Sequence, residues 1–354
     1  MIAGENGVWR IADWSLEAMV LTLELERLAR SAVAVAASSG RVLGAPDALH
    51  GVTIVEAFEL PALGDGVLAS PRLMIAAAGA APGWRRAALL VSTDGGARWD
   101  NAGATAAPAV IGTLTSQVEA GPAAIFDLAN TIEVALANES MLLADADDAG
   151  LDRGANLALV GDELLQFGRA EPIGDCRWRL SRLLRGRRGT EAAIGTQGVG
   201  DRFVLIEQEA LVAIDLPLAS IGAEVRVAAS GIGDLAGPAE TVTPLSGVSV
   251  RPPSPVHLDA RIRESGDVEI SWVRRSRIGW RWIDGADAPL GEESELYRVS
   301  ISGVGVARAA ETAASTMTVT GEERVGGPLT VSVRQAGTNG DSPAAAITIP
   351  AMEE

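Results

Sequence analysis

The chain has 354 residues, of which 47% are hydrophobic and 21% charged, and its formal net charge is −17. A surface this acidic repels nucleic-acid phosphates, which argues against DNA or RNA as a partner. With Cys176 as its one cysteine and His50 and His257 as its only histidines, the chain cannot form an internal disulfide and lacks the ligands of a structural zinc site. We therefore expect no cofactor and no bound metal.

The first 30 residues predict two β-strands. Leu21, Leu23 and Leu25 alternate with polar residues, which is the period of a strand with one buried face. A helix over residues 16–30 is the alternative, because glutamate and leucine are good helix formers. Since two strands are too few for independent stability, we expect residues 1–30 to complete a neighbouring sheet or to be left over from a preceding domain.

Residues 31–250 predict one large β-rich region. Short apolar runs recur between turn signals, at 52–58, 72–78, 87–92, 123–128, 132–136, 156–160, 163–167, 202–207 and 224–229. Many short strands at close spacing are typical of a sandwich or barrel. No internal repeat is visible in the sequence, which argues against a propeller or a solenoid.

A short motif within this region, Ser-Thr-Asp-Gly-Gly-Ala-Arg-Trp at residues 92–99, matches the Asp-box of sialidases. We expect a structural hairpin, in which Asp94 accepts backbone hydrogen bonds, Gly96 tolerates positive φ and Trp99 packs below the turn. A sialidase would need several copies of the motif, and this chain has one.

Residues 251–354 predict a sandwich of about seven strands, which follows a proline-rich linker over 244–255. Apolar residues alternate with polar ones at 256–262, 268–272 and 297–301, and again at 317–319, 329–333 and 347–349. That number of strands in about 100 residues, with no cysteine pair, is typical of the fibronectin-III type. The predicted class of the whole chain is therefore all-β and multidomain.

Five segments together resemble the C-terminal region of one family. They are LLRGRRGTE at 183–191, NLALVGDELLQFG at 156–168, and the stretches 92–99, 270–297 and 331–340. The family is that of the tail-tip or host-specificity proteins (baseplate hub proteins) of siphophage-like particles and alphaproteobacterial gene transfer agents. Its members are usually far longer, with a glycosidase-like TIM barrel and hub domains ahead of this region, so no peptidoglycan-directed activity is carried over to this chain.

The resemblance implies a structural component of a virion or gene-transfer-agent particle, made in the bacterial cytoplasm and placed at the tail tip. It implies other tail or baseplate proteins and further copies of the chain as partners, with a trimer favoured, and contact with a glycan or protein of the host surface. We expect no membrane span, since the most apolar stretch, 19–37, is interrupted by charges. Gln197 stands where relatives often have histidine, which weakens a metal or catalytic role at that position.

Two arginine-rich segments are candidate contact sites. The segment at 274–282 combines the residue types that dominate binding hot spots, and its candidate contacts are Arg274, Arg275, Arg277, Trp280, Arg281 and Trp282. The alternative is that it folds down on the sandwich, with nearby acids neutralising the arginines. In the turn that holds Arg185, Arg187 and Arg188, ion pairs with acids such as Glu191 are favoured over binding of an anion.

Catalysis has only weak candidates. Glu163 with Glu171, or with Asp162, offers an acid–base pair for an envelope glycan hydrolase, which is one alternative function. A carbohydrate-binding module is another. A cluster at Asp145, Asp147 and Asp148 lacks the spacing of a calcium loop and indicates a solvated turn. Because no acid pair stands out among 46 acidic residues, we predict a non-catalytic protein.

Overall fold

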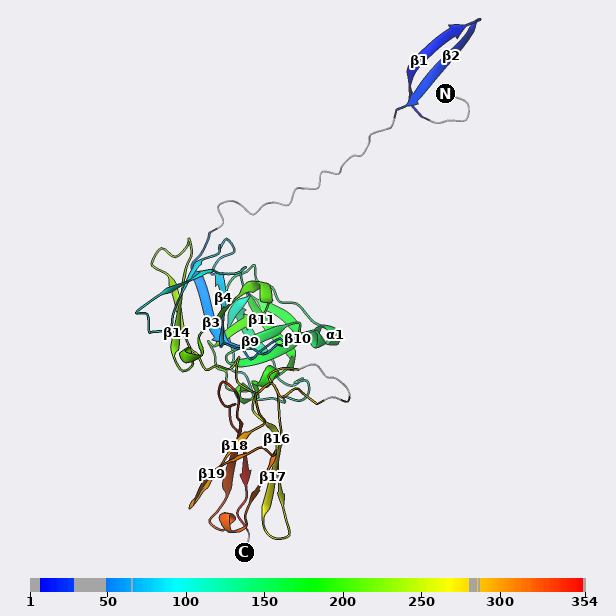
Figure 1. Ribbon diagram of the computed structural model, residues 1–354. Helices are drawn as coiled ribbons and strands as arrows, with labels where there is room; N and C mark the ends of the chain where they lie inside the picture. Colours follow the sequence, from blue (N-terminus) through cyan, green and yellow to red (C-terminus); the bar gives the residue numbers. More distant parts are fainter. Residues whose placement is uncertain (1–6, 29–48, 65, 280–284, 286, 353–354) are drawn as a thin grey trace. The chain divides into compact units, whose positions relative to one another are not determined.

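A computed structural model describes residues 7–28, 49–64, 66–279, 285 and 287–352. Strands make up 44% of it and helix 6%, which confirms the predicted all-β class (Figure 1). The chain divides into two compact units, residues 1–48 and residues 49–354.

The first unit contains one antiparallel hairpin, formed by β1 (Trp9–Glu17) and β2 (Val20–Arg27). Its two turn residues, Ala18 and Met19, both have positive φ, as a tight hairpin turn that follows the strand twist requires. The residues that the alternating pattern placed in a strand are paired in one, so the alternative helix over 16–30 is wrong.

The second unit begins with a seven-stranded sandwich. One sheet has the order β13-β4-β3 and the other β15-β14-β5-β6. The strands are β3 (Thr53–Glu59), β4 (Arg72–Gly79), β5 (Ala88–Ser92), β6 (Asp100–Ala104), β13 (Leu211–Asp215), β14 (Glu224–Ser230) and β15 (Ala239–Pro244). We call this the first sandwich.

A closed barrel is inserted into the first sandwich between β6 and β13. Its strands follow the order β10-β11-β8-β7-β12-β9 around the ring. They are β7 (Ile111–Leu114), β8 (Ile132–Leu136), β9 (Leu157–Val160), β10 (Glu163–Gly174), β11 (Arg177–Leu184) and β12 (Arg202–Leu205). The one α-helix described, α1 (Asp148–Asp152), lies in the connection between β8 and β9 and contacts β10.

The barrel and the first sandwich share a hydrophobic core, and strand β4 shows how. Its alternate residues Leu73, Ile75 and Ala77 pack inside the sandwich. Ala76 and Ala78 point the other way and join the core of the barrel. Because both faces of this strand are covered, its sequence is a continuous apolar run rather than an alternating one.

The terminal sandwich has sheets of order β16-β17-β20 and β19-β18-β21-β22. Its strands are β16 (Val256–Ile262), β17 (Val268–Val273), β18 (Tyr297–Gly303), β19 (Val306–Thr312), β20 (Thr316–Val319), β21 (Leu329–Gln335) and β22 (Ala345–Ile349). The fourth strand, β19, joins the second sheet, whereas in the constant immunoglobulin type the fourth strand joins the first. This strand order is that of a fibronectin-III sandwich, as the sequence pattern predicted. In its core the rings of Trp272 and Tyr297 meet edge to face, with centroids 5.2 Å apart.

The sequence pattern was wrong or silent at several places. The run at 123–128 forms no strand; it has one isolated bridge, between Asp127 and Leu183. Strands β6, β7, β11, β13, β15 and β19 were not predicted. The 3₁₀ turns, also not predicted, lie at Arg187–Gly189, Glu191–Ala193, Gln208–Ala210, Leu218–Ser220 and Glu322–Arg324.

Candidate functional site: the joint between the barrel and the terminal sandwich

The segment Leu183–Glu191, one of the five that carry the family resemblance, leaves the barrel at the end of β11. Its backbone has positive φ at Gly186, Arg188 and Gly189. A Cβ atom on Gly186 would lie 2.9 Å from the Cα atom of Glu191. Only glycine fits there, because the turn folds back on itself at that point.

The side chain of Arg185 points from this segment into the barrel and is buried, with 1% of the residue exposed. Its Nε and Nη2 atoms donate to the two carboxylate oxygens of Glu163, over 2.7 and 2.8 Å. Its Nη1 atom donates to Asp127 over 3.3 Å. A buried charge is tolerated only when it is paired and hydrogen-bonded, and this arginine is both.

The remaining capacity of the Glu163 carboxylate is taken up within the chain. It accepts hydrogen bonds from the backbone N–H of Gly186, over 2.9 Å, and from the amide of Gln197, over 3.0 Å. Burial opposes the charged form of Arg185, but Glu163 and Asp127 outweigh burial and raise the arginine's pKa. The cluster is therefore a polar core that fixes the turn to the barrel.

The same contacts count against the acid–base pairs considered from the sequence. Glu163 is fully buried, so its carboxylate cannot reach a substrate in this structure. Glu171 lies eight residues further along β10, about 26 Å away at the usual rise of a strand, whereas glycoside hydrolysis needs carboxylates about 5–9.5 Å apart. Asp162 is exposed and pairs with Arg202. Neither proposed pair forms a site.

The other end of the segment contacts the terminal sandwich. Both guanidinium Nη atoms of Arg275 donate to the carboxylate of Glu191, over 2.6 and 3.2 Å, and its Nε atom donates to the carbonyl of Ser254. A Cβ atom on Gly189 would lie 2.9 Å from Pro253 in the linker. The turn at 186–191 therefore contacts two parts of the molecule. Gly186 is bound to the polar core of the barrel, and Gly189 and Glu191 contact Pro253 and Arg275 at the joint, the region where the barrel meets the terminal sandwich.

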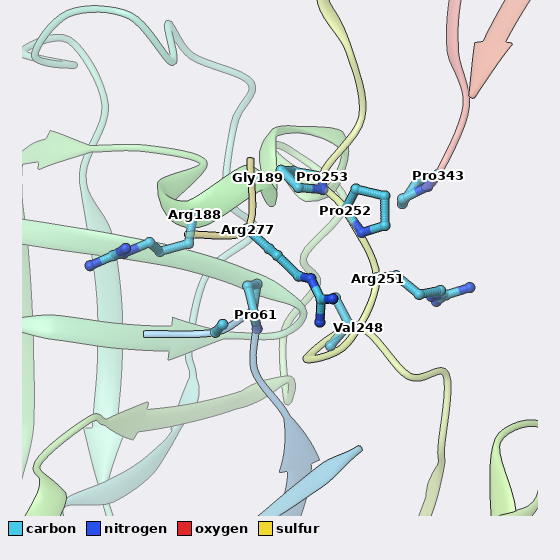
Figure 2. A pocket seen from close by; sticks show the side chains of 10 residues that line it. Pro61, Arg188, Gly189, Val248, Arg251, Pro252, Pro253, Arg277 and Pro343 are labelled. Carbon is cyan, nitrogen blue, oxygen red and sulfur yellow. The ribbon is translucent and has the colours of Figure 1, made fainter. Parts of the chain in front are cut away.

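Arg277 makes a second set of contacts at the joint. It is nearly buried, donates to the carbonyl of Leu68, which precedes the first sandwich's β4, and forms an ion pair with Glu292. Figure 2 shows its side chain reaching toward Val248, while those of Arg188 and Arg251 extend away. The cavity left at the joint measures about 30 Å³, which has room for a few water molecules at most and is far below the size of a ligand site.

These contacts correct part of the contact-site prediction at 274–282. The guanidinium groups of Arg275 and Arg277 are used in the joint, and Arg274 donates to Asp287 and to the carbonyl of Ala288. All three arginine side chains are less than one-sixth exposed, so they do not form an open receptor surface. Trp280, Arg281 and Trp282 lie outside the described residues.

Arginines of the second segment also make contacts within the chain. Arg185 pairs with Glu163 and Asp127, and not with Glu191 as the sequence suggested. Arg187 donates to the side-chain oxygen of Gln166, and Arg188 lines the small cavity of the joint. The sequence signal for the buried pair was an acid directly before two leucines, in ELLQF, and an arginine directly after two leucines, in LLRG, but nothing in the sequence linked the two.

The Asp-box segment forms the turn of the β5–β6 hairpin. The Ser92 hydroxyl and the backbone N–H of Arg98 donate to Asp94, and the N–H of Gly96 donates to Ser92. The hydrogen bond from Arg98, followed by that from Ser92, holds the pKa of Asp94 below its usual range. Trp99 is half-buried, and its ring would lie 3.8 Å from a Cβ atom on Gly96. Every interaction here serves the turn.

The carboxylates of Asp145, Asp147 and Asp148 likewise bind backbone N–H groups or an arginine of the barrel region. Asp147 caps α1 by accepting from the N–H of Gly150, Asp148 pairs with Arg182, and Asp145 accepts from the N–H of Ala170. Across the described ranges, no group of three or more histidine, cysteine or acidic side chains is placed to hold a metal ion. No helix in those ranges is long and apolar enough to cross a membrane.

Comparison with known proteins gives one family match. Residues 109–204 match the model of the family described as "Rcc01698-like, C-terminal". The matched residues begin just before β7 and end inside β12, so they are the barrel. The family is named after a gene related to the gene transfer agent of Rhodobacter capsulatus. A search of curated proteins gave no match.

Solved structures similar to the chain include domains of rat and chicken proteins. Domains d3–d4 of rat CD45 share 6% identity and a TM-score of 0.23, covering 32% of this chain and 55% of that one. A two-domain fibronectin-III segment of chicken tenascin shares 9% and 0.23, covering 68% and 99%. The FN1–FN3 domains of chicken CNTN1 share 8% and 0.22, covering 86% and 98%.

Proposed function

We propose that this chain is a non-catalytic structural component of the tail tip or baseplate of a phage-like or gene-transfer-agent particle, where it contributes to assembly and host-surface attachment. The observation that carries the proposal is the family match over residues 109–204. The segment 183–191 lies within this match and links the barrel to the terminal sandwich through its ion pair with Arg275.

The contacts at the joint favour a mechanical role. Glu163 and Arg185, which were candidates for chemistry or anion binding, hold the barrel turn in place. Glu191, at the end of the same turn, pairs with Arg275 of the terminal sandwich. A module fixed in this way transmits position and load to its end domain. Weak contacts of that end domain with an envelope glycan or protein gain strength from the number of copies in a particle.

The direct test is to locate the chain in a particle. With a C-terminal epitope tag on the native gene, purified particles are expected to contain the protein, and gold-labelled antibody is expected to mark one end of the tail. Deleting the gene is expected to yield particles that lack the tip or fail to adsorb to host cells. Absence of the chain from purified particles would overturn the proposal.

A second measurement addresses catalysis. Incubation of the purified chain with peptidoglycan is expected to release no reducing ends. If release is seen and Glu163→Gln abolishes it while leaving thermal stability unchanged, the non-catalytic part of the proposal is wrong. Glu171→Gln is the matched control, because that acid lies exposed on the same strand.

A further inference from the structure

The β1–β2 hairpin has one face built almost entirely of apolar side chains. Residues directly opposite each other on paired strands share a face. Ile11 is opposite Leu25, Trp14 opposite Leu23, and Leu16 opposite Leu21. We call these three pairs the apolar face. Trp14 is 64% exposed, Leu16 60% and Leu23 41%, so the hairpin does not bury this face by itself.

The opposite face is polar and acidic. The pairs there are Arg10 with Glu26, Asp13 with Glu24, and Ser15 with Thr22. A register shift between Ile11 and Asp13 keeps the two faces separate, because simple alternation would place Asp13 beside Ile11 and turn Trp14 outward. The bulge is therefore a device that preserves the apolar face along the whole hairpin.

Such a hairpin needs a partner to be stable. Within the described residues, β1 and β2 form a sheet with each other alone. An isolated two-stranded hairpin is marginal in water, and a contiguous exposed apolar patch marks an interaction site. A partner that covers the apolar face supplies the second layer that the hairpin lacks.

We propose that the apolar face packs against the same face of another copy of this chain. The face can pack against a copy of itself because its three pairs carry no charge, so no like charges meet in the contact. Arg27, which is opposite Trp9 at the end of this face, lies over the ring of Trp9, with its guanidinium carbon 5.7 Å from the ring centroid. In a face-to-face arrangement the acidic faces point away from each other into solvent, so the chain's strong negative charge does not oppose the contact.

The area of the face is sufficient for this role. Hiding its exposed side chains removes roughly 500 Å² per copy, or about 1,000 Å² for a pair, which reaches the lower limit of specific interfaces. Two packed hairpins form a four-stranded, two-layer core, and a threefold ring of hairpins buries the same face. The inference rests on residues 9–27 and not on the proposed role in a particle.

The first experiment measures self-association of the full chain by sedimentation equilibrium. The unmodified protein is expected to form a dimer or trimer, and Leu23→Glu is expected to weaken association at least tenfold, because it places a charge at the centre of the apolar face. Thr22→Glu is the matched control, since it adds the same charge on the opposite face. A monomeric unmodified protein, or equal behaviour of the two variants, would overturn the proposal.

A second experiment does not depend on the stability of a charged variant. In a Cys176→Ala background, Leu23→Cys is expected to give crosslinked copies with a short bismaleimide, and Thr22→Cys is not. If the face instead covers another part of its own chain, the cysteine of Leu23→Cys is protected from labelling in a monomer. That outcome, or crosslinking equal at both positions, contradicts the inference, whereas the proposed particle role would remain open to its own test.

Discussion

The two sandwiches of this chain have the same strand order but differ in what covers the outer faces of their sheets. In both, strands one, two and five form a three-stranded sheet, and strands four, three, six and seven form the other. The outer surface of β18 in the terminal sandwich meets water, so exposed and buried residues alternate along it. In the first sandwich the sheet that contains β4 is covered by the barrel, and β4 carries no polar side chain after Arg72. One topology thus produces two hydrophobic patterns, according to what covers its outer face.

The sandwiches also differ in the connection between their fourth and fifth strands. In the terminal sandwich, residues 313–315 make this connection. In the first sandwich, residues 105–210 make it and include the whole barrel. Since the entropy of closing a loop grows only slowly with its length, an insertion of this size is tolerated when its two ends stay close together.

The largest effect is expected from breaking the buried ion pair of the barrel. Arg185→Met leaves Glu163 and Asp127 buried without their cation, which costs about 3–5 kcal/mol. Because the first sandwich shares its core with the barrel, hydrogen exchange should quicken in β4 and β10 and stay unchanged in β18 and β21. Arg263→Met, at an exposed ion pair of the terminal sandwich, is the control and should change little. Equal loss of protection in the two sandwiches would contradict the shared core.

A polar substitution tests the double burial of β4. Ala76→Asn places an amide without a partner between the first sandwich and the barrel, at a cost of about 1–3 kcal/mol. Ser300→Asn makes a similar change on the exposed face of β18 and should alter the unfolding midpoint little. Denaturant unfolding of both variants measures the difference. A harmless Ala76→Asn would mean that the barrel does not cover this face in solution.

The joint is expected to contribute less. Arg275 and Glu191 form a partly buried bidentate pair, so Glu191→Ala should weaken coupling between the barrel and the terminal sandwich by about 1–2 kcal/mol. A double-mutant cycle with Arg275→Ala measures the coupling, and limited proteolysis near the proline-rich linker provides a structural readout. Additive effects of the two substitutions would show that the pair does not hold the joint.

The smallest effect concerns two carboxylates of the first sandwich whose pKa values are shifted in opposite directions. Burial raises the pKa of Glu56 although Arg202 acts against it. The stability linked to Glu56 is therefore complete below its unfolded pKa and lost as pH rises through the folded value. Glu56→Gln should be more stable than the unmodified protein at neutral pH, and this advantage should vanish in acid.

Asp94 provides the opposite case. Hydrogen bonds hold its pKa low, so the stability it contributes is present above its unfolded pKa and is lost as pH falls through the folded value. Asp94→Asn should be less stable at neutral pH, and the difference should disappear in acid. Thermal unfolding across pH 3–7 measures both variants. If both variants changed the stability in the same direction at neutral pH, the causes assigned to the two pKa shifts would be wrong.

Part of the fold could be predicted because its signals are local. The alternation in β16, β17 and β18 predicted the terminal sandwich, since one face of each strand lies in water. The hairpin turn at Asp94 was equally predictable, because its donors and acceptors lie within a few residues. The strands β6 and β13 were missed, because their short, weakly alternating sequences become strands only through pairing with β5 and β4.

The candidate site was harder to predict than the fold. Arg185 and Arg275 were singled out, but their partners, Glu163 and Glu191, are set by long-range contacts. For Arg275 and Arg277 the sequence left open both a contact surface and ion pairs within the chain, and the structure pairs both arginines with acids of the chain at the joint. Arginines that pair within a chain and arginines that bind a partner have the same local sequence, so only tertiary structure distinguishes them.

The sequence by itself determined that this protein is β-rich and acidic, that residues 1–30 contain two strands and that residues 251–354 form a fibronectin-III sandwich. These properties depend on composition and on a period of two, which are local. Only the tertiary structure revealed a second sandwich of the same strand order, divided by a barrel. The two halves of that sandwich lie on either side of the barrel in the sequence, and no local pattern connects strands that pair across such a separation.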